Sequence, residues 1–544
     1  MAVIELEALN KEFLGKKILE ELSLEIPEGK MVALAGADGA GKTTLLRLIA
    51  GLLIPTQGKI RVKSQAIGYM PQKFGLYEDL TVIQNLKLYA DLYGVVGEER
   101  QVAFDRLLTF TQLTPFTKRL AGNLSGGMKQ KLGLACTLLH RPRILLLDEP
   151  SVGVDPLSRK ELWDMTIELL KGGVTILWST SYLDEAQKCD LALLLHEGKP
   201  LFYGSPKALM EKVEGRVFKW VLEKDNKRSR LFSILQDPKV VDAQIQGKDI
   251  RIVTKEQLPQ SGWSSAEPRF EDAFIDMLGG VPKGNSKLAE NAPMVQVKSE
   301  WMIEAEGLSK LFKKFVAVER VHLQVKSGEI FGLLGPNGAG KSTIFKMLCG
   351  LLKPTTGKAL VNGFDLQKAP SEARSSIGYM AQKFSLYGDL SLMQNLIFFS
   401  GAYNLKGKEQ KIAIQQMIDI FNFHPFLDQN GRDLPLGYKQ RLALACSVLH
   451  HPEVLFLDEP TSGVDPITRR EFWNHIHGLV AKKTTIMITT HFMDEAEYCD
   501  RIGLIYQGKI IHLGTPDDLK ELAKASTLEE AFITLIEENH VEKD

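Results

Sequence analysis

The feature that most constrains this chain is a loop pattern that it contains twice. G-x-x-x-x-G-K-[ST] fits residues 36–43 and again residues 335–342 of the 544. Such loops are glycine-rich because the backbone N–H groups must approach phosphates closely and several positions need positive φ. The lysine reaches the β- and γ-phosphates, and the final hydroxyl binds Mg²⁺. Two matches in parallel contexts exceed chance, so the sequence predicts two nucleoside triphosphate sites.

The two loops belong to one module that is written twice. Lys42 and Lys341 are 299 positions apart, while Asp148 and Asp458 are 310 apart. Near the ends of the copies the offset falls to 258, so the first copy carries about 52 additional residues. The predicted domains are module 1 at 1–210, a small insert at 211–266, the end of module 1 with a linker at 267–300, and module 2 at 301–544.

Within each copy, apolar strand-like runs alternate with helical stretches, which is typical of a parallel α/β sheet. Residues 31–35 are expected to form a strand that enters the first loop, and residues 42–50 the helix that leaves it. Phosphates would then lie at a helix N-terminus, where free N–H groups favour anions. The insert is expected to form strands at 217–222 and 250–253 with a short helix between them, as a small α/β unit.

Composition excludes several classes of protein. Lys and Arg balance Asp and Glu at 67 each, which argues against nucleic-acid binding. No apolar run approaches the ~18 residues that span a bilayer, and no signal peptide is visible. The five cysteines lie far apart without metal-ligand spacing, so a reducing, cytosolic compartment is expected.

Further motifs follow the loops in a fixed order. Leu124-Ser-Gly-Gly-Met-Lys-Gln130 precedes Leu145-Leu-Leu-Asp-Glu-Pro150, and the second copy adds Thr489-Thr-His491. Together with Gln72 and Gln382, these segments resemble the signature, Walker B, H-switch and Q-loop of ABC ATPases. The resemblance implies a tandem ABC transporter ATP-binding subunit, most similar to the ATPases of bacterial multidrug exporters. It implies an α/β fold of two P-loop NTPase modules, each with a helical signature subdomain.

The resemblance also assigns roles to individual residues, with ATP and Mg²⁺ as ligands. ATP binding falls to the loops Gly36, Ala37, Asp38, Gly39, Ala40, Gly41, Lys42, Thr43, Thr44 and Gly335, Pro336, Asn337, Gly338, Ala339, Gly340, Lys341, Ser342, Thr343, to the stacking positions Phe13 and Phe312, and to Ser125, Gly126 and Gly127. The expected metal ligands are Thr43, Asp148, Ser342 and Asp458. Glu459 is expected to polarise the attacking water, His491 to donate to the γ-phosphate, and Gln382 to touch Mg²⁺ and water.

The copies differ where the chemistry is most demanding. ABC ATPases bind each ATP between the Walker residues of one module and the signature of the other. At the positions that match Ser125, Gly126 and Gly127, the second copy has Pro435, Leu436 and Gly437. The serine hydroxyl is therefore missing, and a bulky side chain replaces a glycine. Opposite His491 the first copy has Ser181. If modules pair within one chain, every departure falls in one degenerate site, with Gln72, Asp148 and Glu149, while the site of Lys341 is complete.

Partners follow from the same resemblance. Transport needs separate transmembrane permease subunits, which places the chain at the cytoplasmic face of the inner membrane as a peripheral subunit. The segments 74–82 and 384–392, after the Q-loop glutamines, resemble a surface that receives a permease; an ordinary strand-to-helix connection is the alternative. The second functional hypothesis is a tandem ABC ATPase of the ribosome, but the short linker and the broken signature argue against it.

Overall fold

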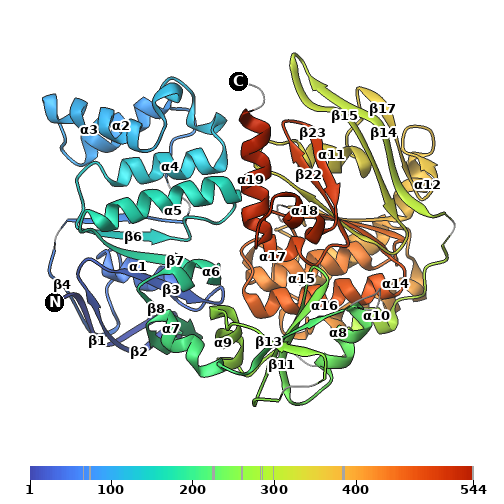
Figure 1. Ribbon diagram of the computed structural model, residues 1–544, viewed down its shortest axis with the longest axis horizontal. Coiled ribbons are helices and arrows are strands. Elements are labelled where there is room, and N and C mark those ends of the chain that lie inside the picture. Colours follow the sequence, from blue (N-terminus) through green and yellow to red (C-terminus); the bar gives the residue numbers. More distant parts are fainter. Residues whose placement is uncertain are drawn as a thin grey trace. The chain divides into compact units, whose positions relative to one another are not determined.

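The computed structural model describes residues 1–541 except 65, 73–74, 223–226, 259–260, 282–283, 285, 298 and 383–385. It forms two compact units (Figure 1). Unit 1 contains Met1–Glu214 and Glu267–Gly279, and unit 2 contains Gly215–Ala266 and Gly280–Asp544. The units therefore do not follow the order of the sequence, because the insert and the residues after position 279 belong to the second one.

Unit 1 is an α/β module built around a six-stranded sheet of order β5-β6-β7-β3-β8-β9. All neighbours in it are parallel except β8 and β9. A second, antiparallel sheet has the order β2-β1-β4. The strands are β1 Ala2–Phe13, β2 Lys16–Pro27, β3 Met31–Gly36, β4 Gln57–Val62, β5 Ile67–Met70, β6 Ile144–Asp148, β7 Thr175–Thr180, β8 Leu191–His196 and β9 Lys199–Gly204.

The central strands β3, β6 and β7 are buried along their whole length, as expected for parallel strands that are covered on both faces. The helices are α1 Lys42–Ile49, α2 Val82–Leu92, α3 Gly97–Phe110, α4 Gly126–Thr137, α5 Pro156–Lys171, α6 Leu183–Lys188, α7 Pro206–Met210 and α9 Phe270–Met277. The predicted strand–loop–helix at 31–50 is confirmed as β3 and α1. Between β5 and β6, α2, α3 and α4 form the helical part of the module.

Unit 2 repeats this arrangement, with a six-stranded sheet of order β19-β20-β21-β16-β22-β23 and an antiparallel sheet of order β15-β14-β17-β18. The strands are β14 Trp301–Phe312, β15 Phe315–Lys326, β16 Ile330–Leu334, β17 Thr356–Val361, β18 Phe364–Asp365, β19 Ile377–Met380, β20 Val454–Asp458, β21 Thr485–Thr489, β22 Arg501–Tyr506 and β23 Lys509–Gly514. The helices are α10 Lys287–Asn291, α11 Lys341–Leu348, α12 Pro370–Ser375, α13 Leu392–Ala402, α14 Gly407–Ile420, α15 Leu436–Val448, α16 Pro466–Ala481, α17 Met493–Ala496, α18 Pro516–Leu522 and α19 Leu528–Val541.

The insert is an antiparallel sheet of order β11-β12-β10-β13 with one helix, α8. Its elements are β10 Val217–Val221, α8 Lys227–Leu235, β11 Val240–Gln246, β12 Asp249–Thr254 and β13 Trp263–Ser265. The two predicted strands and the helix between them are present. The predicted boundary at 211 differs by a few residues, since the short helix Glu211–Val213 still belongs to unit 1.

The segment 267–300, predicted as the end of module 1 with a linker, is divided between the units. Residues 267–279, with α9, return to unit 1, and the segment from Gly280 onward, with α10, belongs to unit 2. Helix α10 lies against α16 at Gly478, where an added Cβ would come within 2.6 Å of the Ala289 Cβ. This part of the linker is therefore packed structure.

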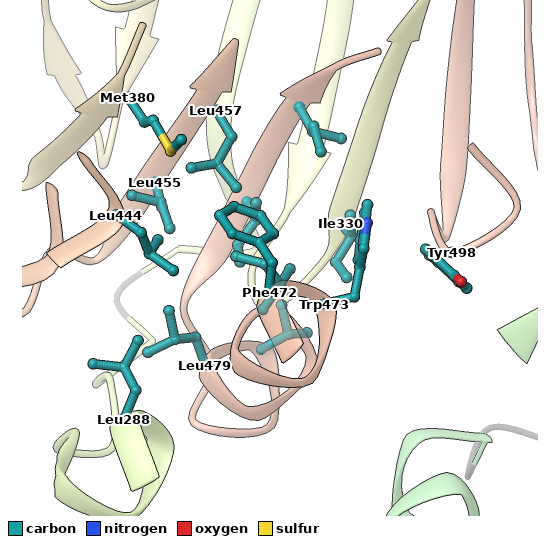
Figure 2. Close-up of a cluster of buried hydrophobic side chains, with 14 of the residues drawn as sticks. Leu288, Ile330, Met380, Leu444, Leu455, Leu457, Phe472, Trp473, Leu479 and Tyr498 are labelled. Carbon is teal, nitrogen blue, oxygen red and sulfur yellow. The ribbon is translucent and has the colours of Figure 1, made fainter. Parts of the chain in front are cut away.

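One apolar core runs through the insert, the linker helix and the large sheet of unit 2. It includes Ile245 and Ile252 of the insert, Leu288 of α10, and Trp473 of α16. Figure 2 shows Phe472, Trp473 and Leu479 of α16 facing Ile330, Leu455 and Leu457 of the sheet, with Tyr498 beside Trp473. Among the described residues, no helix combines the length and apolarity that crossing a membrane requires.

Candidate nucleotide-binding sites

The loop after β16 forms a cradle that only small residues permit. At Gly335 an added Cβ would lie 2.3 Å from the Ile505 carbonyl oxygen, and at Gly340 it would lie 2.7 Å from that of Ala317. Gly340 also has φ 104° and stands immediately before α11, which begins at Lys341. The Lys341 Nζ donates to the carbonyl oxygens of Gly335 and Pro336, at 2.5 and 3.0 Å. The ammonium is thus folded into the loop, at the start of a helix that favours anions.

The first loop repeats this geometry, and its lysine also lies beside a buried glutamate. The Lys42 Nζ donates to the carbonyl oxygens of Gly36 and Ala37, at 2.7 and 3.2 Å, and lies 3.2 Å from Oε1 of Glu149. Both members of this ion pair are buried. Asp38 is exposed at the tip of the loop, where the second loop has the half-buried Asn337. The first loop therefore combines its lysine with one acidic neighbour and carries a second carboxylate at its rim.

The predicted metal ligands of the first module lie together. The Thr43 hydroxyl donates to Oδ1 of Asp148 at 3.0 Å, and Ser179 and Tyr69 also donate to this carboxylate. A hydroxyl beside a carboxylate is a fitting pair of hard oxygen donors for Mg²⁺. In the second module Thr489 donates to Asp458, and burial raises the pKa of that carboxyl despite this hydrogen bond. A divalent cation would offset the cost of burying this charge.

Glu459 is the centre of a three-residue cluster in the second module. Its backbone has φ 47°, an uncommon conformation for a residue with a side chain. The Gln382 Nε2 donates to Oε2 at 2.7 Å, and the His491 Nδ1 lies 3.2 Å from the same oxygen. Burial acts to raise the pKa of Glu459, but His491, Lys341 and Gln382 together hold it below its usual value. Glu459 is therefore ionised at neutral pH and linked to both predicted partners.

The equivalent glutamate of the first module has a different set of neighbours. Glu149 also has positive φ, 49°, but its Oε2 accepts from the backbone N–H and hydroxyl of Ser181, at 2.9 and 3.2 Å. Its other oxygen faces Lys42. Gln72 is exposed on its loop. A hydroxyl thus takes the place of an imidazole, and the glutamate is bound to its own loop lysine.

The two signature segments both precede a helix, with different N-caps. Ser125 caps α4, and its Oγ accepts from the Met128 N–H at 3.2 Å. Pro435 stands at the same place before α15 and provides no side-chain cap. The helix survives the substitution, as expected, while the hydroxyl is lost. Leu436 and Gly437 are half-buried in its first turn.

Gly127 has a structural requirement that the motif alone does not reveal. An added Cβ would come within 2.4 Å of the Ser158 Cβ, which belongs to α5. The matching Gly437 has its nearest neighbour at 3.5 Å, an ordinary contact. The glycine of the first signature is therefore needed for helix packing as well as for approach of a phosphate.

The predicted stacking aromatics are exposed. Phe13 and Phe312 are 43% and 47% exposed at the ends of β1 and β14, each with a lysine ammonium over the ring. Neither is a core residue. A base could stack on the face of each ring that the ammonium does not cover.

Sequence reasoning missed a buried glutamate beside each site. The Glu185 Oε2 accepts from Ser151, Trp178 and Thr180, at 2.9, 2.8 and 2.6 Å, and burial raises its pKa to about 7. Its counterpart Glu495 accepts from Thr490 at 2.7 Å. The signal was present, since Asp-Glu-Ala occurs in both copies at an offset of 310. Glu185 connects the segment after the Walker B glutamate with the strand that leads to Ser181.

The described residues include only part of the predicted permease surface. Residues 73–74 and 383–385, including Phe74 and Phe384, lie outside the described residues. Beyond them Tyr77 and Tyr387 are exposed, and their backbone N–H groups donate to Asn85 and Asn395. The described parts of the two segments are therefore built alike.

Comparisons with known proteins point to one family. The family model described as "ABC transporter" matches residues 19–152 and 318–462. A "Probable multidrug ABC transporter ATP-binding protein YbhF" of Escherichia coli is 54% identical over 98% of both chains. A "Putative ABC transporter ATP-binding protein" of Bacillus cereus is 28% identical over 93% of this chain and 89% of its own. A solved ATP-binding subunit of an ABC transporter, 28% identical, covers 43% of this chain and 99% of its own, with a TM-score of 0.41.

Proposed function

Because the chain belongs to the ABC transporter family, with the ATP-binding module present twice, we propose that it energises an exporter through separate transmembrane subunits. The family and its 54% identical relative indicate ATPase activity. The name of that relative supports a multidrug class of transport. The remaining question is how the chain distributes ATP hydrolysis between its two loops.

We place hydrolysis at the loop of module 2. The observation that carries this assignment is the cluster of Gln382, Glu459 and His491 around one carboxylate oxygen. Because its lowered pKa keeps it ionised, Glu459 has a carboxylate that can accept a hydrogen bond or a proton from the attacking water, which Gln382 orients. His491 and Lys341 then stabilise charge on the γ-phosphate. Phosphoryl transfer depends mainly on such positioning and charge stabilisation.

Ser342 and Asp458 would hold Mg²⁺ in this site, as Thr43 and Asp148 would in the other. The cation neutralises charge on the β- and γ-phosphates when it is bound. The protein side chains provide the hard oxygen donors. The Thr43–Asp148 contact of 3.0 Å supports this assignment.

We propose that the loop of module 1 holds a nucleotide and turns it over slowly or not at all. Glu149 faces Lys42 and Ser181, so no imidazole is present to donate to a γ-phosphate. If ATP pairs each module with the opposite signature within one chain, this site also receives Pro435 and Leu436. The other site receives Ser125, Gly126 and Gly127 and lacks nothing. Loss of a single transition-state donor costs ~3–4 kcal/mol in well-studied enzymes.

Matched glutamate variants test this asymmetry. Glu459→Gln should abolish nearly all ATP turnover, while Glu149→Gln should leave most of it, measured as phosphate release by the full chain with Mg²⁺. Binding of a fluorescent ATP analogue controls for folding and should persist in both variants. Equal losses of turnover would contradict the assignment.

The transport proposal is tested by fractionation. Since ATP hydrolysis by the chain is useful only when coupled to a membrane subunit, we propose a peripheral location at the cytoplasmic face of the inner membrane. The chain should sediment with membranes when its permease subunits are co-expressed and remain in the supernatant without them. Cosedimentation with ribosomes instead would contradict the proposal.

A further inference from the structure

The insert is bound to module 2 by four buried polar side chains whose hydrogen bonds, closed by the β11 backbone between residues 242 and 244, form a polar ring. Arg470 of α16 donates through Nε to Oδ2 of Asp242 at 3.2 Å and through Nη1 to the Tyr498 hydroxyl at 2.9 Å. The same hydroxyl donates to Oε1 of Gln244 at 3.0 Å. All four residues are buried. These hydrogen bonds join β11, α16 and the segment after α17, while Oδ1 of Asp242 is buried without a hydrogen-bond partner among the described residues. Because a partly satisfied buried pair is costly to disturb, the ring fixes the relative position of the three segments.

The ring touches the elements that hold the catalytic cluster. Helix α16 begins beside Asp465, whose carboxylate caps it by accepting from the Ile467 and Thr468 N–H groups. Arg469, next to Arg470, lies 4.4 Å from the ring centroid of Phe492. Phe492 in turn packs on the His491 ring, with centroids 4.5 Å apart. A shift of this turn of α16 would therefore move His491 relative to Glu459.

Module 1 keeps the inner part of this arrangement and lacks the outer part. The Arg159 guanidinium lies 4.9 Å from the Tyr182 ring centroid, which corresponds to the 4.4 Å contact of Arg469 with Phe492. The positions that match Arg470 and Tyr498 are the exposed Lys160 and Lys188. The polar ring thus exists only in the module to which hydrolysis is assigned.

A second contact shows the same dependence of module 2 on the insert. In module 1, Asp190 accepts from the Met31 N–H and pairs with Lys30, both at 2.9 Å. In module 2, Asp500 accepts from the Ile330 N–H at 2.9 Å, but Glu329 stands where Lys30 would be. Arg228 and Lys227 of the insert, at 2.5 and 3.7 Å, supply the cations for Asp500. The insert therefore replaces a partner that module 1 has in its own strand.

We propose that residues 215–266 act as a positioning domain for the active site of module 2. Asp242 and Gln244 hold Arg470 and Tyr498, and through Arg469 and Phe492 they keep His491 aligned with Glu459. Neither insert residue touches ATP, so their contribution is to the rate of hydrolysis and not to nucleotide affinity. The inference rests on the proposed assignment of hydrolysis to module 2.

Tyr498→Phe tests the ring with the smallest change. It removes one hydroxyl and keeps the aromatic ring against Trp473. Loss of a hydrogen bond worth ~1 kcal/mol should lower kcat about fivefold, with the KM for ATP unchanged. Asp242→Asn should lower kcat in the same way. The controls are Lys255→Ala on the exposed surface of the insert and Lys160→Ala in module 1, and both should keep the parental kcat.

The outcomes separate a positioning role from a structural one. A fall in kcat with constant KM and a melting temperature within about 2 °C of the parent supports the proposal. Unchanged kcat in both ring variants overturns it, as does a loss of kcat with a matching loss of bound ATP analogue. If Glu459→Gln is inactive while the ring variants are fully active, only this inference fails. If Glu459→Gln is active, the assignment of hydrolysis fails first.

Discussion

The imidazole of His491 and the carboxylate of Glu459 lie 3.2 Å apart, and the corresponding pair in the first module is a hydroxyl and a carboxylate, Ser181 and Glu149, at the same separation. The two pairs have the same separation, but their side chains differ in chemistry. A hydroxyl can satisfy the glutamate but cannot carry the positive charge that a γ-phosphate would attract. The two modules share the strand and loop at this point, β7 and β21, and differ in one side chain there, serine or histidine.

Repair of the first site is the most direct test of that difference. In a Glu459→Gln background, Ser181→His combined with Pro435→Ser and Leu436→Gly should restore measurable ATP turnover. The reason is that the three changes supply the missing donor and reopen the signature. Phosphate release by the repaired chain measures it. Turnover that stays at the level of the Glu459→Gln parent would show that other features silence the site.

Gly127 should tolerate substitution far less than Gly437. Gly127→Ala places a Cβ about 2.4 Å from Ser158, so overpacking should destabilise unit 1 by about 1–3 kcal/mol. Gly437→Ala has room at 3.5 Å, and alanine favours a helix, so it should be neutral or slightly stabilising. Thermal unfolding without nucleotide measures both effects. Equal melting temperatures for the two variants would refute the packing argument.

Phe312 should contribute to nucleotide affinity without contributing to stability. The ring is 47% exposed, so Phe312→Ala removes little core packing. Base–aromatic stacking is worth ~1–3 kcal/mol in nucleic-acid complexes, so the KM for ATP should rise about fivefold or more. Phe364→Ala, on β18 of the same sheet, is the matched control and should leave the KM unchanged. A lowered melting temperature in Phe312→Ala would indicate a structural role instead.

Unit 2 should lose stability as the pH falls below about 6.5. Burial lowers the pKa of His450 to about 4, against the hydrogen bond between its Nε2 and the Ile377 carbonyl oxygen. Burial also lowers the pKa of His475 to about 4. Between about pH 6.5 and pH 4 the unfolded chain binds protons at these histidines that the folded chain does not. The free energy of unfolding therefore decreases as the pH is lowered through this range. The loss is up to about 3 kcal/mol per histidine.

His450→Phe isolates one of these contributions. Phenylalanine can keep the stack on Tyr403, whose ring centroid lies 3.6 Å from that of His450. The fall in melting temperature between pH 7 and pH 5 should be smaller than in the parent. His424→Gln, at an exposed position, is the control and should follow the parental profile. A parental profile in His450→Phe would exclude His450 as a source of the pH dependence.

Local pattern predicted most of the two modules, for a physical reason. A phosphate loop requires a strand before it and a helix after it, so β3 with α1 and β16 with α11 follow from the glycines and the apolar runs around them. The same holds for β6 and β20, which end at Asp148 and Asp458. Periodicity also predicted β10 and β12 of the insert, but not β11 and β13.

The placement of the insert could not be predicted in this way. Asp242 and Arg470 are separated by 228 positions, and neither shows its partner in the surrounding sequence. The close approach of Gly127 to Ser158 and the pairing of Lys42 with Glu149 are likewise tertiary. Side-chain contacts of this kind depend on which surfaces of helices and sheets pack together. A hydrophobic pattern shows which face of an element is buried, but not which other element packs against it.

The path of the chain between the two compact units has a consequence for synthesis on the ribosome. The chain passes from one unit to the other after Glu214, Ala266 and Gly279. The insert emerges early, but Arg470 and Tyr498 leave the ribosome more than two hundred residues later. Its apolar face, with Ile245 and Ile252, must therefore remain without its core partners in α16 while the two hundred residues between them are synthesised. Completion of the insert's core thus waits for α16, and a nascent chain stalled before α16 should be a preferred client of chaperones.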